Sequence, residues 1–292
     1  MQELQFIGSY VALVTPFKNG VVDEAALCRL VEWHVKNGTD GLVPMGTTGE
    51  SSTVTAEEHK YVVEMVVKTV ARRIPVIAGA GSNNPVEALS FAQHAESVGA
   101  DGVLCVAGYY NRPSQEGLYQ HFKMIHDNTN IPIIIYNIPP RAVVDITPDT
   151  MARLAGLPRV VGVKDATGDL TRISQERRLI KKPFCYLSGD DMTAVAYNAL
   201  GGNGCISVTA NVFPQLSTAL QKACLSHDYQ RALAYHDQLI PVHQALFEEP
   251  SPSGVKFAMS YLGLCDDEVR LPILGVSTHL QSVIRQCIDD KK

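Results

Sequence analysis

The chain has 292 residues and little excess charge of either sign, because 25 Lys and Arg stand against 30 Asp and Glu. No basic run gathers along it, and a protein that binds nucleic acid needs a basic surface to neutralise phosphates. Long apolar runs are also missing. The most apolar stretches, such as residues 131–135, are far shorter than the roughly 20 residues that cross a bilayer. We therefore expect no nucleic-acid partner, no membrane span and no secretory leader.

Cysteine is scarce, and its seven positions are scattered with no Cys-x-x-Cys pair. An odd number of well-separated thiols indicates reduced cysteines and a cytoplasmic location. The nine histidines contain no His-Glu-x-x-His sequence, and His121 and His126 are five residues apart, so their rings do not share a helical face. The sequence therefore predicts no metal site.

What the chain does contain is a regular alternation of short apolar runs and helical patterns. Each run is rich in Val, Ile and Leu, is too short for an ordinary helix and is bounded by Gly or Pro. These features are typical of strands that a parallel sheet buries on both faces. Eight such runs are present, at residues 10–14, 41–45, 75–78, 102–106, 132–136, 160–164, 184–187 and 204–208.

Helix signals lie between the apolar runs. The capping box at residues 55–58 predicts a helix over 56–71. Asn84 is followed by proline at the first helical position, so we expect it to cap a second helix, which Gly99 ends. One face of this second helix is predicted to carry the apolar side chains Val86, Leu89, Ala92 and Ala95.

Eight strands that alternate with helices predict a (β/α)8 barrel, the TIM-barrel fold, with a C-terminal helical extension. We expect the barrel core over residues 1–214 and the extension over 215–292, where the pattern is helical only. Helices are predicted over 216–227 and 229–247, and a third after the break at 250–254. The same alternation would also fit an open, doubly wound sheet with a helical appendage. The barrel is favoured because no Gly-x-Gly-x-x-Gly sequence opens a helix after a strand.

Polar residues follow most of the predicted strands, at the end of a barrel where active sites lie. Lys164 ends the apolar run 160–163. Desolvation disfavours the charged form of an amine, and a neutral amine can attack a carbonyl carbon to form a Schiff base. A lysine here could instead reach solvent with its ammonium group or pair with Asp165. Lys164 is our first candidate for a catalytic nucleophile.

Three further positions complete a candidate site. Thr47 and Thr48 lie between two glycines, so the backbone can point successive N–H groups at a carboxylate, although the threonines could merely satisfy a tight turn. The hydroxyl of Tyr136 could pass protons between a nitrogen and a carbonyl oxygen, or simply be satisfied in the core. Arg141 could bind a substrate carboxylate or be solvated in a loop. Together these residues indicate a lysine-dependent aldolase.

At these residues the chain resembles the dihydrodipicolinate synthase family, within the pyruvate-dependent class I aldolases and lyases. The resemblance covers essentially the whole chain. The segments that carry it are GTTGES at 46–51, YYNRPSQEG at 109–117, YNIPPR at 136–141, VKDATGD at 163–169, LSGDD at 187–191 and ISVTAN at 206–211.

The resemblance implies a Schiff-base-forming lyase that condenses pyruvate with L-aspartate 4-semialdehyde to give 4-hydroxy-tetrahydrodipicolinate for lysine and diaminopimelate biosynthesis. It implies a homotetramer built as a dimer of dimers, and no cofactor. The alternatives are another pyruvate aldolase, such as one acting on 2-keto-3-deoxy sugar acids, and a catalytically silent paralogue. Arg141 favours the synthase, because polyol aldehydes give no reason for a cation at this place.

The resemblance also implies a role for each residue of the site. Lys164 would condense with pyruvate beside Tyr136, and Tyr136, Thr47 and Tyr110 would relay protons, with Tyr110 supplied by a neighbouring subunit across a tight dimer interface. Arg141 would bind the carboxylate of the semialdehyde. The substrate-binding residues would be Thr47, Thr48, Arg141, Gly189 and Ile206.

A lysine effector site at the tight dimer interface is implied as well. Ala56 stands where a histidine is frequent in feedback-inhibited relatives, so we expect lysine to bind but to inhibit with reduced strength. Ala107-Gly108 replaces a frequent Thr-Pro, and the greater backbone freedom could loosen Tyr110. The matching effector positions are Ser51, Ser52, His59, Asn83, Glu87 and Tyr109.

Overall fold

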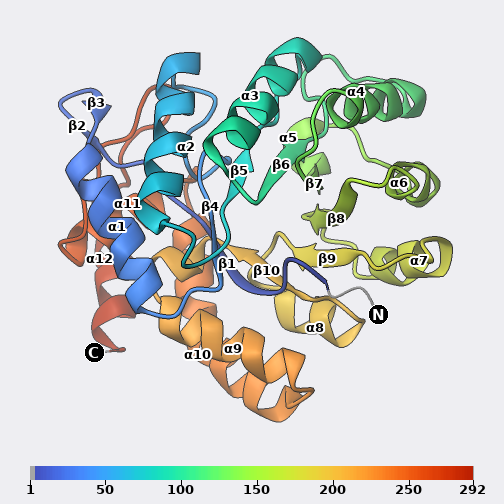
Figure 1. Cartoon of the computed structure of the whole chain (residues 1–292). Coiled ribbons are helices and arrows are strands. Elements are labelled where there is room, and N and C mark those ends of the chain that lie inside the picture. Colours follow the sequence, from blue (N-terminus) through green and yellow to red (C-terminus); the bar gives the residue numbers. More distant parts are fainter. Residues whose placement is uncertain (1–3, 292) are drawn as a thin grey trace.

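The computed structural model describes residues 4–291 and shows a parallel barrel surrounded by helices (Figure 1). The strand order is β4-β1-β10-β9-β8-β7-β6-β5, and neighbouring strands run parallel. A bridge between Leu42 and Val76 and a 2.8 Å hydrogen bond from Gly79 N–H to the Pro44 carbonyl join β4 to β5. This closure confirms the predicted TIM barrel and excludes the open sheet. The barrel strands are β1 (Gly8–Ala12), β4 (Gly41–Val43), β5 (Ile77–Gly79), β6 (Gly102–Val106), β7 (Ile133–Asn137), β8 (Val160–Asp165), β9 (Cys185–Ser188) and β10 (Gly204–Ser207).

Each barrel strand buries both of its faces, which explains why the sequence shows near-continuous apolar runs and no alternation. All eight predicted strands are present, with their ends displaced by at most two residues. Successive side chains point alternately into the barrel and toward the helices. The inward set packs as one cluster that includes Tyr10, Val43, Ile77, Leu104, Ile134 and Ile206. The outward set packs with the surrounding helices in a second cluster that includes Val11, Leu42, Val103, Ile135 and Val163.

Helices cover the outside of the barrel. The predicted capping box is formed at Thr55, and the predicted helix after Asn84 ends at Gly99, which adopts the left-handed conformation. One expectation is wrong: Val86 is exposed, because it lies two residues before the buried Ala88 and so about 200° around the helix. The helices between strands are α1 (Glu24–Lys36), α2 (Ala56–Val70), α3 (Pro85–Val98), α4 (Gln115–Asp127), α5 (Pro139–Ala142), α6 (Pro148–Ala155), α7 (Thr171–Leu179), α8 (Ala194–Ala199) and the 3-10 helix η1 (Thr209–Asn211).

A small antiparallel hairpin that the sequence did not predict precedes α1. It consists of β2 (Phe17–Lys18) and β3 (Val21–Val22). The two strands have two residues each, and Lys18 and Val21 are both exposed, so no alternation of apolar and polar residues marks them.

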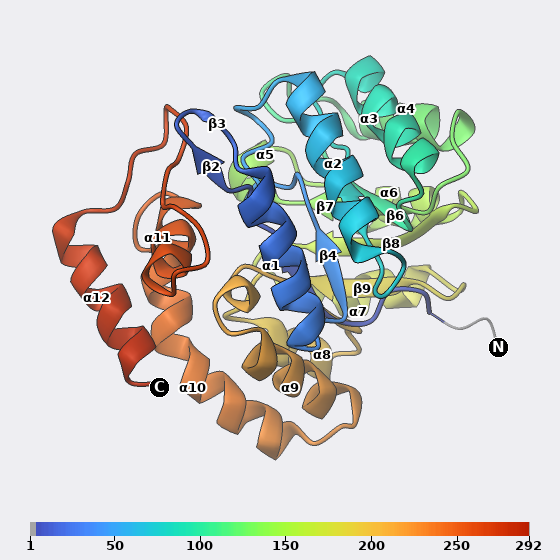
Figure 2. The same ribbon diagram turned by 60° about the vertical axis from the view of Figure 1, so that its left-hand side comes forward.

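The C-terminal segment is helical, as predicted, in α9 (Pro214–Leu225), α10 (Tyr229–Phe247), α11 (Ser253–Tyr261) and α12 (Thr278–Asp289). Helix α9 packs against β1 and β10 and completes the ring around the barrel. Helices α11 and α12 pack on α10, on the left of Figure 2. The boundary between core and extension at residue 214 stays a prediction.

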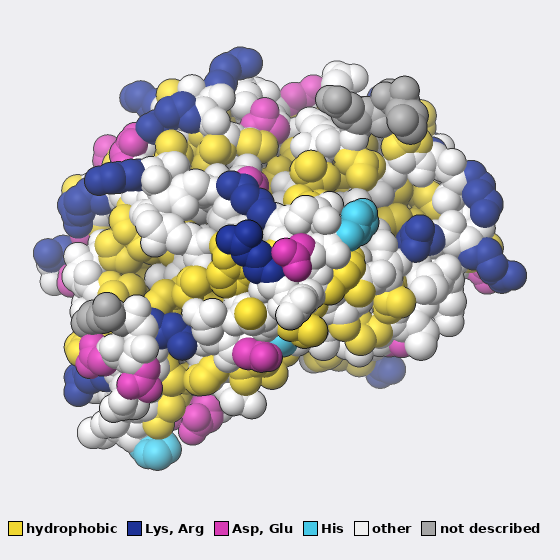
Figure 3. Space-filling view, turned by 90° about the horizontal axis from the view of Figure 1, so that it is seen from below, with side chains coloured by type: hydrophobic (Ala, Val, Ile, Leu, Met, Phe, Trp, Pro, Cys, Tyr) yellow, Lys and Arg dark blue, Asp and Glu magenta, His cyan; other side chains and the backbone are white. Residues whose placement is uncertain are grey.

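Two surface properties bear on the sequence expectations. On the face seen in Figure 3, basic and acidic side chains are interspersed with apolar ones. Among residues 4–291, no helix has both the length and the apolar character that crossing a membrane requires.

Candidate active site

A cavity of about 530 Å³ lies at the carboxyl ends of the barrel strands. Its wall is formed by the turn after β4, by α2, α3 and α5, and by the ends of β5, β6 and β7. Members of both predicted sites line it, so the candidate substrate and effector residues share one space. These residues are Thr47, Tyr136 and Arg141 on the substrate side, and Ser51, Ser52, His59, Glu87 and Tyr109 on the effector side.

Lys164 and Tyr136 are register partners on β8 and β7. The Nζ of Lys164 lies 4.2 Å from the ring centroid of Tyr136, and each residue is only 6% exposed. This burial excludes the alternative in which the lysine reaches solvent. Asp165 points to the other side of the strand, where it accepts a 2.9 Å hydrogen bond from Thr167 N–H. Within residues 4–291, neither the Lys164 ammonium group nor the Tyr136 hydroxyl has a hydrogen-bond or ion-pair partner.

Gly189 leaves the space that Lys164 occupies. Its N–H donates a 2.6 Å hydrogen bond to the Asp165 carbonyl, which brings the ends of β8 and β9 together. A Cβ at Gly189 would lie 3.0 Å from the Cε of Lys164 and 2.9 Å from the Cβ of Ala166. A larger residue would therefore displace the lysine side chain. Ile206, on β10, is buried inside the barrel.

The turn after β4 carries Thr47 and Thr48. Glu50 N–H donates a 3.1 Å hydrogen bond to the Thr47 carbonyl, and the Thr15 hydroxyl donates a 2.7 Å bond to the Gly49 carbonyl. In the part of the chain that the structure describes, no hydrogen bond engages the amide or the hydroxyl of Thr47 or Thr48. The turn is thus held by other groups, and Thr47, which lines the cavity, has its amide and hydroxyl without a partner in the described chain.

Arg141 and Tyr110 are both exposed, but only Arg141 lines the cavity. Arg141 lies on the four-residue α5, and no side chain among residues 4–291 pairs with its guanidinium. Tyr110 is 89% exposed and has a φ of 68°, while its neighbour Tyr109 faces the cavity. Within one chain, Tyr110 thus lies outside the site, and its role from a neighbouring subunit stays a prediction. Four other predicted substrate-site residues are also absent from the described cavity wall: Thr48, Lys164, Gly189 and Ile206.

The predicted effector residues lie along α2, α3 and the loop after β6. His59 stacks on Phe91 with ring centroids 3.9 Å apart, and burial lowers the pKa of His59 to about 4. The imidazole is therefore neutral at neutral pH. The Ser82 hydroxyl donates a 2.6 Å hydrogen bond to Glu87 Oε2 in the first turn of α3. Asn83 lies outside the cavity wall and instead donates through Nδ2 to the carbonyl of Tyr109, at 3.2 Å.

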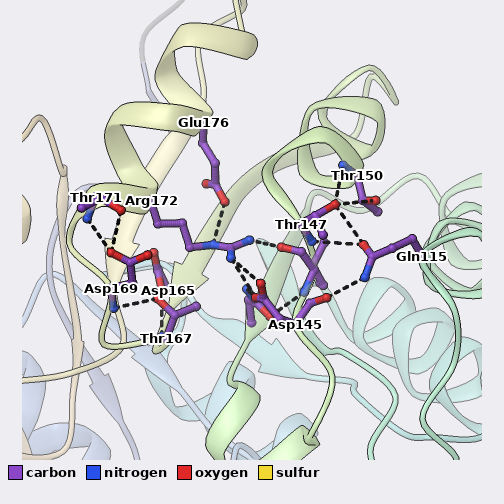
Figure 4. Close-up of polar contacts among 12 residues, drawn as sticks. Gln115, Asp145, Thr147, Thr150, Asp165, Thr167, Asp169, Thr171, Arg172 and Glu176 are labelled. Carbon is purple, nitrogen blue, oxygen red and sulfur yellow. Dashed lines mark hydrogen bonds and ion pairs between the residues drawn. The ribbon is translucent and has the colours of Figure 1, made fainter.

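A polar network that the sequence analysis missed lies on the outer side of β7 and β8 (Figure 4). Arg172 lies between two carboxylates: its Nη1 is 2.8 Å from both oxygens of Asp145, and its Nε is 3.2 Å from Oε1 of Glu176. Asn137, next to Tyr136, donates through Nδ2 to Asp145 Oδ1 at 2.8 Å. The network thus ties the end of β7 and the loop after α5 to α7.

Burial sets the protonation of this network. It raises the pKa of Glu176 to about 7, although Arg172 opposes the shift, and it raises the pKa of Asp165 as well. The only signal for the network in the sequence is the spacing of Arg172 and Glu176, four residues apart on one helix. Such pairs are usually exposed, so the spacing gave no reason to expect burial.

Residues 5–291 match the model of the Dihydrodipicolinate synthetase family. The 4-hydroxy-tetrahydrodipicolinate synthase of Parvibaculum lavamentivorans is 59% identical over 272 residues, which cover 93% of this chain and 94% of that protein. The crystal structure of dihydrodipicolinate synthase from Aquifex aeolicus is 46% identical, with a TM-score of 0.97 and 98% of both chains covered.

Two further solved relatives contain ligands. The dihydrodipicolinate synthase of Acinetobacter baumannii in complex with pyruvate is 41% identical, with a TM-score of 0.95 and 97% of this chain and 98% of that chain covered. The relative from Cyanidioschyzon merolae with lysine bound is 33% identical, with a TM-score of 0.94 and 97% of both chains covered. On the family match and these identities, the chain belongs to the dihydrodipicolinate synthetase family.

Proposed function

We propose that this chain is a lyase that condenses pyruvate with L-aspartate 4-semialdehyde to give 4-hydroxy-tetrahydrodipicolinate, a step of lysine and diaminopimelate biosynthesis. The observation that carries the proposal is the buried Lys164, whose Nζ lies 4.2 Å from the ring centroid of Tyr136. The tyrosine in turn lines a cavity that also contains the unpaired guanidinium of Arg141. The family membership and the names of the relatives support the same reaction.

The chemistry begins at Lys164. Its Nζ attacks C2 of pyruvate, and loss of water gives an imine, whose nitrogen is a better electron sink than a ketone oxygen. The methyl group then loses a proton to form an enamine, which attacks the aldehyde carbon of the second substrate. The amine of that substrate attacks the imine carbon, closes a six-membered ring and releases Lys164. The bonds balance with one water lost overall.

Each remaining site residue has a place in this sequence. The free amides and hydroxyls of Thr47 and Thr48 bind the pyruvate carboxylate, while Tyr136, Thr47 and a neighbouring subunit's Tyr110 pass protons. Arg141 binds the carboxylate of the semialdehyde through its planar guanidinium, with Gly189 and Ile206 shaping the pocket. The charge of Arg141 supports the semialdehyde over the uncharged aldehydes that related aldolases use.

The assembly and the effector belong to the same proposal. An 89% exposed tyrosine at position 110 fits a subunit that completes its neighbour's site, and we propose a homotetramer of two such dimers in the cytoplasm. Lysine is the proposed effector, with Glu87 as a partner for its ammonium group. The lysine-bound structure of the Cyanidioschyzon merolae relative supports this choice.

The test is a borohydride trap. The protein is incubated with pyruvate, reduced and digested, and the added mass is located by mass spectrometry. We expect the adduct at Lys164, none at the fully buried Lys256, and none in Lys164→Ala. Absence of any adduct in folded protein would reject the aldolase mechanism and favour the silent paralogue. An adduct without turnover of aspartate semialdehyde would favour another pyruvate aldolase.

A further inference from the structure

The C-terminal extension places a second lysine inside the protein. Lys256, on α11, is 0% exposed, and its Nζ forms an ion pair with Oε1 of Glu50, itself only 4% exposed. The same Nζ donates a 2.7 Å hydrogen bond to the Glu268 carbonyl and lies 4.1 Å from the ring centroid of Phe17. The ammonium group is therefore held by a carboxylate, a carbonyl and a ring face, and Lys256 is not among the residues that line the cavity.

A second cation of the extension binds the same region. The backbone N–H of Arg270 donates a 2.9 Å hydrogen bond to Oε2 of Glu50. Its guanidinium contacts both carboxylate oxygens of Glu58, each at 2.6 Å, and lies 4.3 Å from the ring centroid of Phe17. Glu58 closes the capping box of α2. The extension thus binds Glu50 and Glu58, the two ends of the segment that follows the threonines.

Glu50 belongs to the turn that presents those threonines. Its N–H donates to the Thr47 carbonyl at 3.1 Å, and its φ of 58° lies in the left-handed region, which a residue with a side chain adopts only when its surroundings hold it there. Both oxygens of its carboxylate are bound by the extension, one by Lys256 and one by Arg270. The side chain of Glu50 therefore transmits the position of α11 to the turn.

An apolar side chain of similar size could fill the space that Lys256 occupies. Burial disfavours its ammonium and lowers the pKa of Lys256, while Glu50 opposes this shift. Buried ion pairs are often no more stabilising than well-packed apolar pairs, but each charge strongly prefers one geometry. Because Glu50 lies two residues after Thr48, the pair can act through the geometry of the turn that carries the threonines.

We propose that Lys256 is a positioning residue: through its ion pair with Glu50 it fixes the turn that carries Thr47 and Thr48, which makes the C-terminal extension part of the pyruvate-binding apparatus. This inference rests on the proposed function, because it assigns the turn to the carboxylate of pyruvate. Its consequence is selective. Loss of the pair weakens the handling of pyruvate and leaves the contact of Arg141 with the second substrate unchanged.

The experiment replaces Lys256 by methionine, which has nearly the same length and no charge. Borohydride trapping against pyruvate concentration and steady-state kinetics on both substrates are compared with wild type. In Lys256→Met we expect the pyruvate concentration for half-maximal trapping and the pyruvate KM to rise by about tenfold or more. The KM for aspartate semialdehyde is expected to change by less than about twofold, since Arg141 is untouched.

A matched control separates positioning from stability. Ile284→Ala on α12 opens a cavity in the extension at a residue 2% exposed, away from the turn. It should lower the melting temperature and leave the pyruvate dependence of trapping as in wild type. Lys256→Met leaves Glu50 as a buried unpaired charge and could fail to fold for that reason. In that case the double variant Lys256→Met/Glu50→Gln, which removes both charges, is measured instead. The same rise in the pyruvate concentration for half-maximal trapping is expected.

The outcomes are distinct. A folded Lys256→Met or double variant that traps pyruvate at the wild-type concentration overturns the positioning role and leaves the proposed function intact. A parallel rise in the KM of both substrates, or the same rise in Ile284→Ala, also overturns it, because general loosening would explain both results. A wild-type protein that traps no pyruvate rejects the proposed function itself.

Discussion

Gly189 and Lys164 share one space at the mouth of the barrel: a Cβ on the glycine would lie 3.0 Å from the Cε of the lysine. The glycine is also tied to β8 by its 2.6 Å hydrogen bond to the Asp165 carbonyl, so it cannot move away without breaking that bond. The position of the Lys164 side chain is therefore limited by the absence of a side chain at Gly189, directly after β9.

Gly189→Ala should fold and lose activity. The new methyl group also meets the Cβ of Ala166 at 2.9 Å, and the lysine must shift from its place over the Tyr136 ring. We expect the rate of imine trapping by pyruvate to fall by about tenfold or more. Gly275→Ala is the matched control, because nothing lies within 4 Å of a Cβ there. Wild-type trapping in Gly189→Ala would show that the lysine tolerates displacement.

Arg141→Ala should separate the two half-reactions. Its guanidinium is unpaired in the described chain and lines the cavity, so we assign it to the carboxylate of the semialdehyde. The KM for aspartate semialdehyde should rise by about tenfold or more, from the loss of a hydrogen-bonded charge contact, while imine trapping by pyruvate is preserved. Arg178→Ala, at an exposed position on α7, is the control. Equal losses in both steps would contradict the role given to Arg141.

Tyr110 should act in the site of a neighbouring subunit. Lys164→Ala and Tyr110→Phe are each expected to be nearly inactive. In a mixed dimer, however, the Tyr110→Phe subunit keeps its lysine and receives an intact tyrosine from its partner. One of the two sites in such a dimer is then complete, so about half of wild-type activity per dimer is expected. The measurement is the activity of the co-expressed, doubly tagged dimer against each single variant. No recovery in a proven heterodimer would place Tyr110 elsewhere.

Lysine should bind the cavity and inhibit with reduced strength, because Ala56 provides no ring beside His59. Calorimetric titration with lysine is expected to show binding that is lost in Glu87→Gln, where the carboxylate for the ammonium group is removed. Ala56→His should strengthen inhibition in the steady-state assay. Val86→Ala, an exposed change on α3, serves as the control. No heat of binding and a flat activity curve across millimolar lysine would reject the effector site.

The free energy of unfolding should fall with rising pH because of Glu176. Burial raises the pKa of its carboxyl from 4.5 to about 7, so the folded state favours the protonated form. This contribution is fully present below pH 4.5 and is lost as the pH rises through about 7, a loss on the order of 3 kcal/mol. Glu176→Gln, which can still accept the hydrogen bond from Arg172, should remove that loss between pH 5 and pH 8 in chemical denaturation. The control Glu64→Gln, on the exposed face of α2, should keep the pH-dependent loss of stability. The same pH dependence in wild type and Glu176→Gln would refute the assignment to Glu176.

The succession of eight strands along the chain, and the polar residues that follow them, could be read from the sequence alone. A strand buried on both faces must be continuously apolar, and a polar residue that follows it lies at the end of the barrel where a ligand can reach it. Lys164, Thr47, Tyr136 and Arg141 could therefore be singled out without coordinates. The burial of Val86 could not be predicted correctly. The apolar residues of α3 are compatible with two overlapping helix faces, and only packing against the barrel selects the one that is buried.

Closure of the barrel was decided by tertiary structure. The alternation of strands and helices fits a closed barrel or an open sheet, and only the pairing of β4 with β5 distinguishes them. Tertiary structure also decided which distant residues form contacts. Asp145 binds Arg172, and Glu50 pairs with Lys256, from which it is separated by more than two hundred residues in the sequence. A charged residue in a sequence does not reveal whether water or a distant partner will balance its charge. Only the fold determines this, because burial makes a partner obligatory and geometry selects which residue it is.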